Sequence, residues 1–379
     1  MKNTTDNDAE EGLFINEAAP IKLWHEAENI PEEVRGKDSF NDQGFVLRAK
    51  ADTGEDIHLW TFMYQQRGRE SIIQADVNQM LLICGKFTDQ DKEYMNPFAN
   101  ATTVNVGQDV ADYFKPGSIK ISEDADKVIW KCENLEYICT PPEWHVRGER
   151  GGVKVDIKWT QVNNAFWHLG TFENMKRPGM AGYVVHCRAS GTVEVEGKVM
   201  TFSNQYGTHE RITQQIYVPD RSGHMGGKGL HWMHGYSESL DWFLMRSDVG
   251  KGLGTAMINV GNEQILLEDP SSCGVEENGS WIDPQSRVVT PFKWRVWVRT
   301  PKGNLETLVQ SYARQYYTWA RRGATLIVNQ HCADAQTDFT FPDGRKISEK
   351  QMVSIEHMRT FYRQLSTIQN RGGPEHLFQ

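Results

Sequence analysis

Residues 182–211 read GYVVHCRASGTVEVEGKVMTFSNQYGTHER, and this stretch decides the fold that we expect for the chain. Its first half is rich in Val, Thr and Tyr, and the turn at Glu196-Gly197-Lys198 contains the glycine that a tight hairpin needs. The sequence therefore predicts two antiparallel strands over residues 183–195 and 199–211.

The second strand of this hairpin carries an unusual density of polar side chains. Because successive side chains of a strand point to opposite faces, alternate residues share a face. Burying such groups without partners would cost about 1–3 kcal/mol each, so a polar face either meets water or lines a site. One face would carry Asn204, Tyr206, Thr208 and Glu210, and the other Ser203, Gln205, His209 and Arg211.

The bulk properties limit the class of protein. A chain of 379 residues exceeds the roughly 250–300 residues at which single cores stop growing, so we expect two domains. The 12 tryptophans suit β-structure around a large apolar cavity, although each could equally fill a core. A net charge of −9 argues against a nucleic-acid partner.

The sequence also favours a cytoplasmic protein. The six cysteines show no CxxC spacing, which favours reduced thiols in the cytosol. The first dozen residues are polar and acidic, so they predict no secretory signal, and no apolar run has the length of an integral membrane segment.

Short strand-like segments separated by Gly- and Asp-containing turns predict an all-β fold of two successive meanders. The turn-rich, aromatic segment 163–181 is the expected domain boundary. We expect residues 1–20 to be a disordered tail, 21–165 and 166–346 to be two β-domains, and 347–379 to be a C-terminal helix and tail.

Two segments are predicted as helices, namely 305–322 and 348–369. In the second, Ser348 can cap the helix, and apolar residues recur at intervals of three and four. This stripe would pack on a barrel, and homodimer formation through it is the alternative. The stripe comprises Met352, Ile355, Met358, Tyr362 and Leu365.

From Phe166 onward, the aromatic linker, the ASGTVEVEGK hairpin and the Tyr-x-x-His strand end resemble a known family. This is the two-domain, lipocalin-like family that includes bacterial carotenoid 1,2-hydratases, and similar folds occur in some fungal cyclases. The clear likeness covers roughly residues 165–245. It implies two tandem lipocalin-like β-barrels or sandwiches that act, mostly without cofactors, on large hydrophobic substrates.

The resemblance also implies site residues. Tyr206 and His209 match the family's Tyr-x-Asp-His strand end, in which the aspartate is the acid that protonates an alkene. Position 208 is Thr, which cannot protonate an isolated alkene, so Glu210 or His209 has taken the acid role or the chemistry differs. A glutamate in an aromatic cavity would have a raised pKa and could act as a general acid.

The segment His231-Trp232-Met233-His234 offers a second candidate. Two histidines three apart on a helix could share a metal ion. We instead predict a strand, on which they point to opposite faces, and we expect no metal site. One face of that strand would combine an aromatic wall with acid–base groups, or would be a solvated surface. Its members are Trp232, His234, Tyr236 and Glu238.

Further residues are predicted to bind substrate. His186 and Arg188 share a face of the first hairpin strand, and Trp167 would lie at the barrel mouth or pack in the core. We assign to catalysis Tyr206, His209, Glu210, His234, Tyr236 and Glu238, and to substrate binding Trp167, His186, Arg188, Asn204, Thr208, Trp232 and Trp242.

Together these features predict a cofactor-independent lyase or isomerase, of the hydratase, dehydratase or cyclase type. Its partner would be a hydrophobic small-molecule substrate: a terpenoid, polyketide or phenolic aromatic. No glycine-rich phosphate loop or GxSxG motif occurs, which argues against nucleotide cofactors and serine hydrolases. The alternatives are a non-catalytic carrier of apolar ligands and, less favoured, a metal-dependent hydrolase built on His231 and His234.

Overall fold

The computed structural model describes residues 16–29, 39–67, 74–93, 109–175, 180–215, 230–247, 254–283, 288–321 and 324–362. In these ranges almost all regular structure is β, which confirms the predicted class. The helical elements are the 3₁₀ turns η1 (Leu23–Glu26) and η2 (Phe172–Asn174) and the short α2 (Asp89–Glu93). None of the described helices is long and apolar enough to cross a membrane. Most of the predicted tail, residues 1–15, lies outside the described residues.

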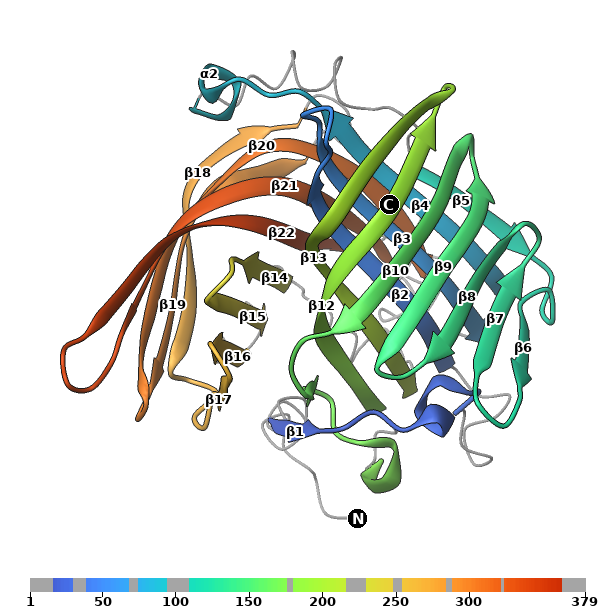
Figure 1. Ribbon diagram of the computed structural model, residues 1–379, viewed down its shortest axis with the longest axis horizontal. Helices are drawn as coiled ribbons and strands as arrows, with labels where there is room; N and C mark the ends of the chain where they lie inside the picture. The colour runs from blue at the N-terminus through green and yellow to red at the C-terminus, as the bar shows by residue number, and fades with distance from the viewer. Residues whose placement is uncertain are drawn as a thin grey trace, which may run out of the picture.

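Two curled antiparallel sheets, which we call the first and second half-barrels, make up the fold (Figure 1). The first runs in the order β5 (Asp109–Phe114), β4 (Ala75–Gly85), β3 (Asp56–Arg67), β2 (Ser39–Lys50), β13 (Lys198–Gln215), β12 (Met180–Val195), β10 (Val153–Gln161), β9 (Glu143–Arg150), β8 (Leu135–Thr140), β7 (Val128–Cys132) and β6 (Lys120–Glu123), with β11 (Ala165–Trp167) and β1 (Glu17–Ala19) added beside β12. The second runs in the order β17 (Glu263–Leu266), β16 (Gly254–Val260), β15 (Leu240–Ser247), β14 (Leu230–Tyr236), β22 (Lys346–Tyr362), β21 (Ala324–Thr340), β20 (Gly303–Arg321), β19 (Val289–Thr300) and β18 (Cys273–Ile282).

The hairpin predicted from residues 182–211 is confirmed as β12 and β13. Its two-residue turn has positive φ at Glu196 (50°) and at Gly197 (77°), the conformation of a type I′ hairpin. Strand β13 also pairs with β2, so the hairpin lies in the middle of the first half-barrel. The chain changes sheets between Gln215 and Leu230, whereas the domain boundary expected at 163–181 falls within the first half-barrel.

The glycine between the two polar residues Tyr206 and Thr208 has a packing role. A Cβ on Gly207 would lie 2.6 Å from Trp159 Nε1 and 2.6 Å from the carbonyl oxygen of Val46. Only glycine therefore lets the indole of Trp159 pack against β13.

Both predicted helices are wrong where the structure describes them. Residues 305–321 belong to β20, and 348–362 belong to β22, which pairs with β14 on one side and β21 on the other. The strand is buried on both faces, so apolar residues occur on both, and their spacing imitates a helical stripe. Ile355 faces the interior of the second half-barrel, whereas Met358 faces the first half-barrel. The predicted dimerisation stripe therefore does not form, and residues 363–379 lie outside the described residues.

Three apolar cores hold the molecule together. One fills each half-barrel, and the third joins residues of both sheets. Arg48 of β2 crosses this third layer, where its guanidinium donates to the carbonyl oxygens of Val353 and Ala333 and to the hydroxyl of Tyr312, at 2.9–3.2 Å. Because a buried guanidinium is stable only when its donors are used, this clamp fixes the two sheets face to face.

Candidate active site

Five polar side chains form an unbroken series of contacts between the two sheets, which we call the inter-sheet relay. His186 Nδ1 of β12 lies 2.5 Å from Asp241 Oδ1 of β15, and His186 Nε2 lies 3.0 Å from His234 Nδ1 of β14. Thr208 Oγ1 of β13 lies 3.4 Å from the same nitrogen of His234 and 2.7 Å from the hydroxyl of Tyr236. Both half-barrels therefore contribute to one polar cluster.

The protonation state of the relay follows from its end groups. Asn259 donates a hydrogen bond of 2.6 Å to Asp241 Oδ1, which holds the carboxylate beneath His186. A carboxylate beside Nδ1 keeps the proton on that nitrogen and directs Nε2 of His186 at His234. Burial and the neighbouring imidazoles hold the pKa of His234 well below its ordinary value. His234 is therefore neutral near pH 7, the form that can accept a proton.

Three carboxyl groups lie on the same inter-sheet face. Burial, followed by the charges of Asp42 and Glu356, raises the pKa of Glu210 well above its ordinary value. Burial raises the pKa of Glu356 to about 7, although Gln330 donates to its Oε2 at 2.5 Å. Asp42 accepts from the backbone N–H of Ile212 at 2.8 Å, and burial raises its pKa well above the ordinary value. The raised pKa makes Glu210 the candidate proton donor of this face.

Aromatic rings surround these polar groups. Trp60 stacks on Phe62 and on Tyr317, with ring centroids 4.7 and 5.0 Å apart, so the aromatic layer spans both sheets. Phe243 packs on His234 at 4.8 Å. These rings belong to the apolar layer that joins the two sheets, and they give the polar groups apolar surroundings.

A pocket of about 340 Å³ opens beside the relay. Tyr206 and Tyr236 form part of its wall, with their rings stacked at 5.9 Å, and the guanidinium of Arg188 lies 4.4 Å from the ring centroid of Tyr206. Because Tyr236 also contacts Thr208, the pocket adjoins the relay. The pocket also includes Ser237, Glu238, Glu349, Lys350 and Met352.

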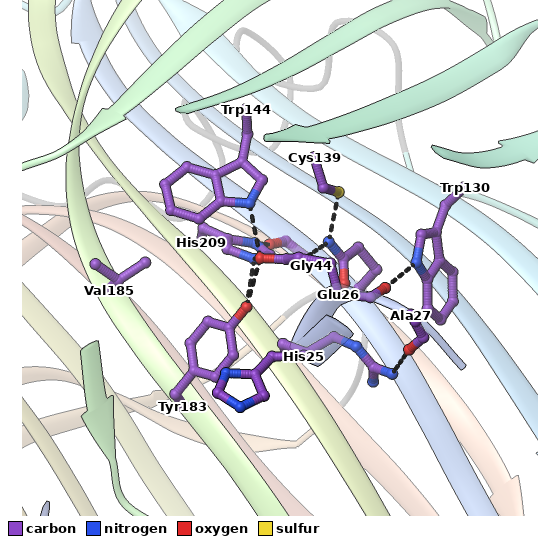
Figure 2. A network of polar contacts seen from close by, with 12 residues as sticks. His25, Glu26, Ala27, Gly44, Trp130, Cys139, Trp144, Tyr183, Val185 and His209 are labelled. Atoms are coloured by element: carbon purple, nitrogen blue, oxygen red, sulfur yellow. Dashed lines mark hydrogen bonds and ion pairs between the residues drawn. The ribbon is translucent and has the colours of Figure 1, made fainter. Parts of the chain in front are cut away.

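A second polar network lies inside the first half-barrel and involves His209 (Figure 2). The carboxylate of Glu26, at the end of η1, accepts hydrogen bonds from Gln43 Nε2 (2.6 Å), Tyr183 OH (2.7 Å) and Trp144 Nε1 (2.9 Å). His209 Nε2 lies 3.3 Å from both carboxylate oxygens, and its Nδ1 lies 3.0 Å from the carbonyl oxygen of Gly44. We call this the Glu26 network.

The Glu26 network is buried, and the carboxylate at its centre has hydrogen-bond partners. Glu26 and His209 are both fully buried. Burial by itself would raise the pKa of Glu26, but the charge of His209 and the hydrogen bonds lower it to about 2. A carboxylate that accepts this many hydrogen bonds stays ionised at neutral pH and has no proton to donate. The structure therefore places His209 away from Glu210, on the opposite face of β13.

The predicted site residues do not all lie together. The exposed Glu238 lines the pocket, and Arg188 lies over the ring of Tyr206. The inter-sheet side carries Tyr206, Thr208, Glu210, His186, His234, Tyr236 and Trp232. Trp167 packs on Tyr183 in the core of the first half-barrel, at 4.6 Å. Trp242 lies inside the second half-barrel, where it donates to Gln351 Oε1 at 2.6 Å. Asn204 is exposed, with a φ of 52°.

Asp241, Asp42 and Glu356 were not predicted. Asp241 interrupts the otherwise apolar run Leu240–Leu244, and an acidic residue in such a strand is a signal that could have been used. Glu356 was hidden because its segment was predicted as a helix. Asp42 carried no signal, since its partners come from a distant strand.

Comparisons with known proteins support the fold. No protein-family model matches the chain, and no curated protein matches it in sequence. Its structure is similar to that of a protein from Nitrosomonas europaea provisionally named AttH, with a TM-score of 0.57 and 11% identity over 89% of this chain and 98% of that one. It also matches kievitone hydratase from Nectria haematococca, with 10% identity over 90% of this chain and 94% of that one, but the TM-score of 0.46 is too low to support an assignment.

The likeness to the AttH-named protein shows a shared fold. It agrees with the broad architecture that the sequence resemblance implied, and it does not single out the carotenoid hydratases.

Proposed function

We propose that the protein is a lyase or isomerase that binds a hydrophobic small molecule between its two half-barrels and transforms it by general acid–base chemistry. The observation that carries this proposal is the inter-sheet relay, in which Asp241, His186 and His234 join end to end beneath an aromatic layer. Such a series supplies a neutral base with a carboxylate behind it, and Glu210 on the adjoining strand supplies an acid.

The proposed reaction adds or removes water. In the elimination direction, His234 takes a proton from carbon while Glu210 gives its proton to a neighbouring hydroxyl group. The carbon–oxygen bond breaks, water leaves, and the electron pair of the carbon–hydrogen bond forms the double bond. Hydration is the reverse. Protons then return from His234 to Glu210 through the solvent, so the protein is regenerated without an oxidant or reductant.

The geometry of β13 supports this division of roles. Thr208, which contacts His234, and Glu210 are two residues apart on one face, a spacing of about 7 Å along the strand. We propose that the base, which lies beside Thr208, and the acid at Glu210 reach neighbouring atoms of one substrate. In this proposal the hydroxyl of Tyr236 holds a substrate oxygen that enters from the pocket, which Tyr236 helps to line.

The aromatic layer supports a hydrophobic substrate. A phenolic, terpenoid or polyketide skeleton would bury its rings or methyl groups against Trp60 and Phe243, and it would direct one oxygen to the relay. We propose this substrate class in preference to charged metabolites, because the burial that raises the pKa of Glu210 and Glu356 would also disfavour an ionic group in a ligand.

The proposal is tested by incubating the protein with hydroxylated and unsaturated members of these three classes and measuring by mass spectrometry the gain or loss of one water. The variants His234→Ala and Glu210→Gln should lose turnover. His145→Ala, which removes an exposed imidazole beside Asp156, is the matched control and should retain it. If ligands bind with micromolar affinity and no member of the panel is transformed, the protein is a carrier and the proposal fails.

A further inference from the structure

Inside the second half-barrel, three side chains from neighbouring strands point to the same side. His231 of β14 is paired directly with His357 of β22, which is paired with Asn329 of β21. Directly paired residues share a face, and the two imidazole centroids lie 4.8 Å apart. His231 is 1% exposed, and the other two are fully buried.

A carboxylate from the far edge of the sheet reaches the same point. Glu277 of β18 places Oε1 3.2 Å from His231 Nε2 and 3.4 Å from His357 Nε2. Donor atoms of a tetrahedral zinc site with bonds of about 2.0–2.1 Å are about 3.3 Å apart, so these separations fit a shared ion. One ligand atom from each residue lies within 4.8 Å of the other two.

We propose that His231, His357 and Glu277 form a binding site for a divalent first-row metal ion, with zinc the best match to two imidazoles and one carboxylate. Three protein ligands leave a fourth position for water. The site is separate from the inter-sheet relay, because His231 and His234 point to opposite faces of β14. It therefore does not rest on the proposed function.

The surroundings contain polar groups suited to a second layer around an ion. Among the described residues, the side-chain amide of Asn329 and Nε2 of His331 have no hydrogen-bond partner, although both residues are fully buried. Such atoms are costly unless water or another group satisfies them. Asn329 is paired directly with His357, which puts its amide on the same face of the sheet beside the proposed site.

One positive group competes with the ion. Arg359 Nη2 lies 2.7 Å from Glu277 Oε1 and neutralises the carboxylate in the metal-free protein. Arg359 binds the same oxygen that lies nearest both imidazoles, so it would have to move to Oε2 when the ion binds Oε1. Arg359 then orients the ligand, as outer groups of metal sites commonly do.

The position in the sheet suggests what the ion does. Strand β18 is an edge of the second half-barrel, and β14 lies five strands away in the sheet order. An ion held by Glu277 on one side and the two histidines on the other would fasten the curled sheet across its interior. Since such a site does not exist in the unfolded chain, binding would stabilise the fold.

The test uses the full chain without an affinity tag, stripped by a chelator and dialysed. Titration with zinc should show one ion per chain by calorimetry, and the ion should raise the melting temperature by several degrees. Cobalt(II) should give the intense visible bands of a tetrahedral site. His357→Ala and the milder Glu277→Gln should each weaken zinc binding by about 100-fold or more.

His145→Ala, which removes an imidazole of β9 far from this cluster in the sequence, is the control and should bind zinc as the unchanged protein does. The proposal is overturned if the stripped protein binds no stoichiometric zinc, or if Glu277→Gln, folded by circular dichroism, binds zinc as tightly as the unchanged protein. If His357→Ala does not fold, Glu277→Gln alone decides.

Discussion

The Glu26 network and the inter-sheet side that carries the relay contain the same kinds of side chain, but the surroundings shift the pKa values of their glutamates in opposite directions. Glu26 is surrounded by four donor groups and its pKa is lowered to about 2, whereas Glu210 lies among other carboxyl groups and its pKa is raised. A satisfied carboxylate stabilises the fold around it. A carboxyl group with a raised pKa, on the same inter-sheet side as a neutral imidazole, is what the proposed acid–base function requires.

The largest effect should come from removing the base of the relay. His234→Ala should lower kcat/KM by about 10²–10⁴-fold, because a positioned general base contributes about that factor. Melting temperature and activity are measured on the same preparation. Retention of more than half the activity in a folded variant would remove His234 from the mechanism.

Glu26→Ala should have its effect on stability instead. Removing one partner of a buried ion pair costs about 3–5 kcal/mol, and here it also leaves Trp144 and Tyr183 without their acceptor. Denaturant unfolding measures the loss. At a temperature where the variant is folded, turnover per folded molecule should match that of the unchanged protein, and a specific loss of turnover would show that the two networks are not distinct in role.

The two carboxyl groups should also give opposite pH dependences of stability. Glu26 has its pKa lowered from 4.5, so its contribution is complete above about pH 4.5 and is lost as the pH falls towards 2. Glu210 has its pKa raised above 4.5, so stability falls as the pH rises and its proton is removed. In urea unfolding across pH, Glu26→Ala should flatten the acidic side and Glu210→Gln the neutral and alkaline side. The account would be contradicted if Glu26→Ala flattened the neutral and alkaline side and Glu210→Gln flattened the acidic side.

The smallest effect should come from the hydroxyl at the pocket. Tyr236→Phe removes one hydrogen-bonding group that contacts Thr208 and keeps the ring that stacks on Tyr206. Loss of one hydrogen bond of about 1–1.5 kcal/mol lowers turnover about 10-fold. Steady-state kinetics would separate this from a loss of apolar binding, which would raise KM and leave kcat unchanged.

Much of the fold follows from strand alternation. The hairpin at Glu196-Gly197 and the opposite faces of Glu210 and His209 could be predicted, because a period of two and a glycine turn are local signals. The segment 348–362 could not, because β22 lies between two sheet neighbours and two apolar layers. There, Met352, Ile355 and Met358 belong to alternating faces and still recur every three residues.

Only part of the candidate site could be predicted from the sequence. Thr208, Glu210, His234 and Tyr236 were predicted because polar and ionisable side chains concentrate on those strand faces. Their partner Asp241 was missed, since its contact with His186 joins two sheets and depends on how the half-barrels pack. No local sequence pattern predicts how the two half-barrels pack.

The most direct measurement is a side-by-side comparison of His234→Ala and Glu26→Ala on one substrate from the panel, with turnover expressed per folded molecule and unfolding measured on the same samples. The account predicts that His234→Ala loses turnover by about 100-fold or more and stays folded, and that Glu26→Ala loses stability and keeps its turnover. The reverse pattern, in which Glu26→Ala abolishes turnover while folded and His234→Ala remains active, would place the chemistry inside the first half-barrel and contradict it.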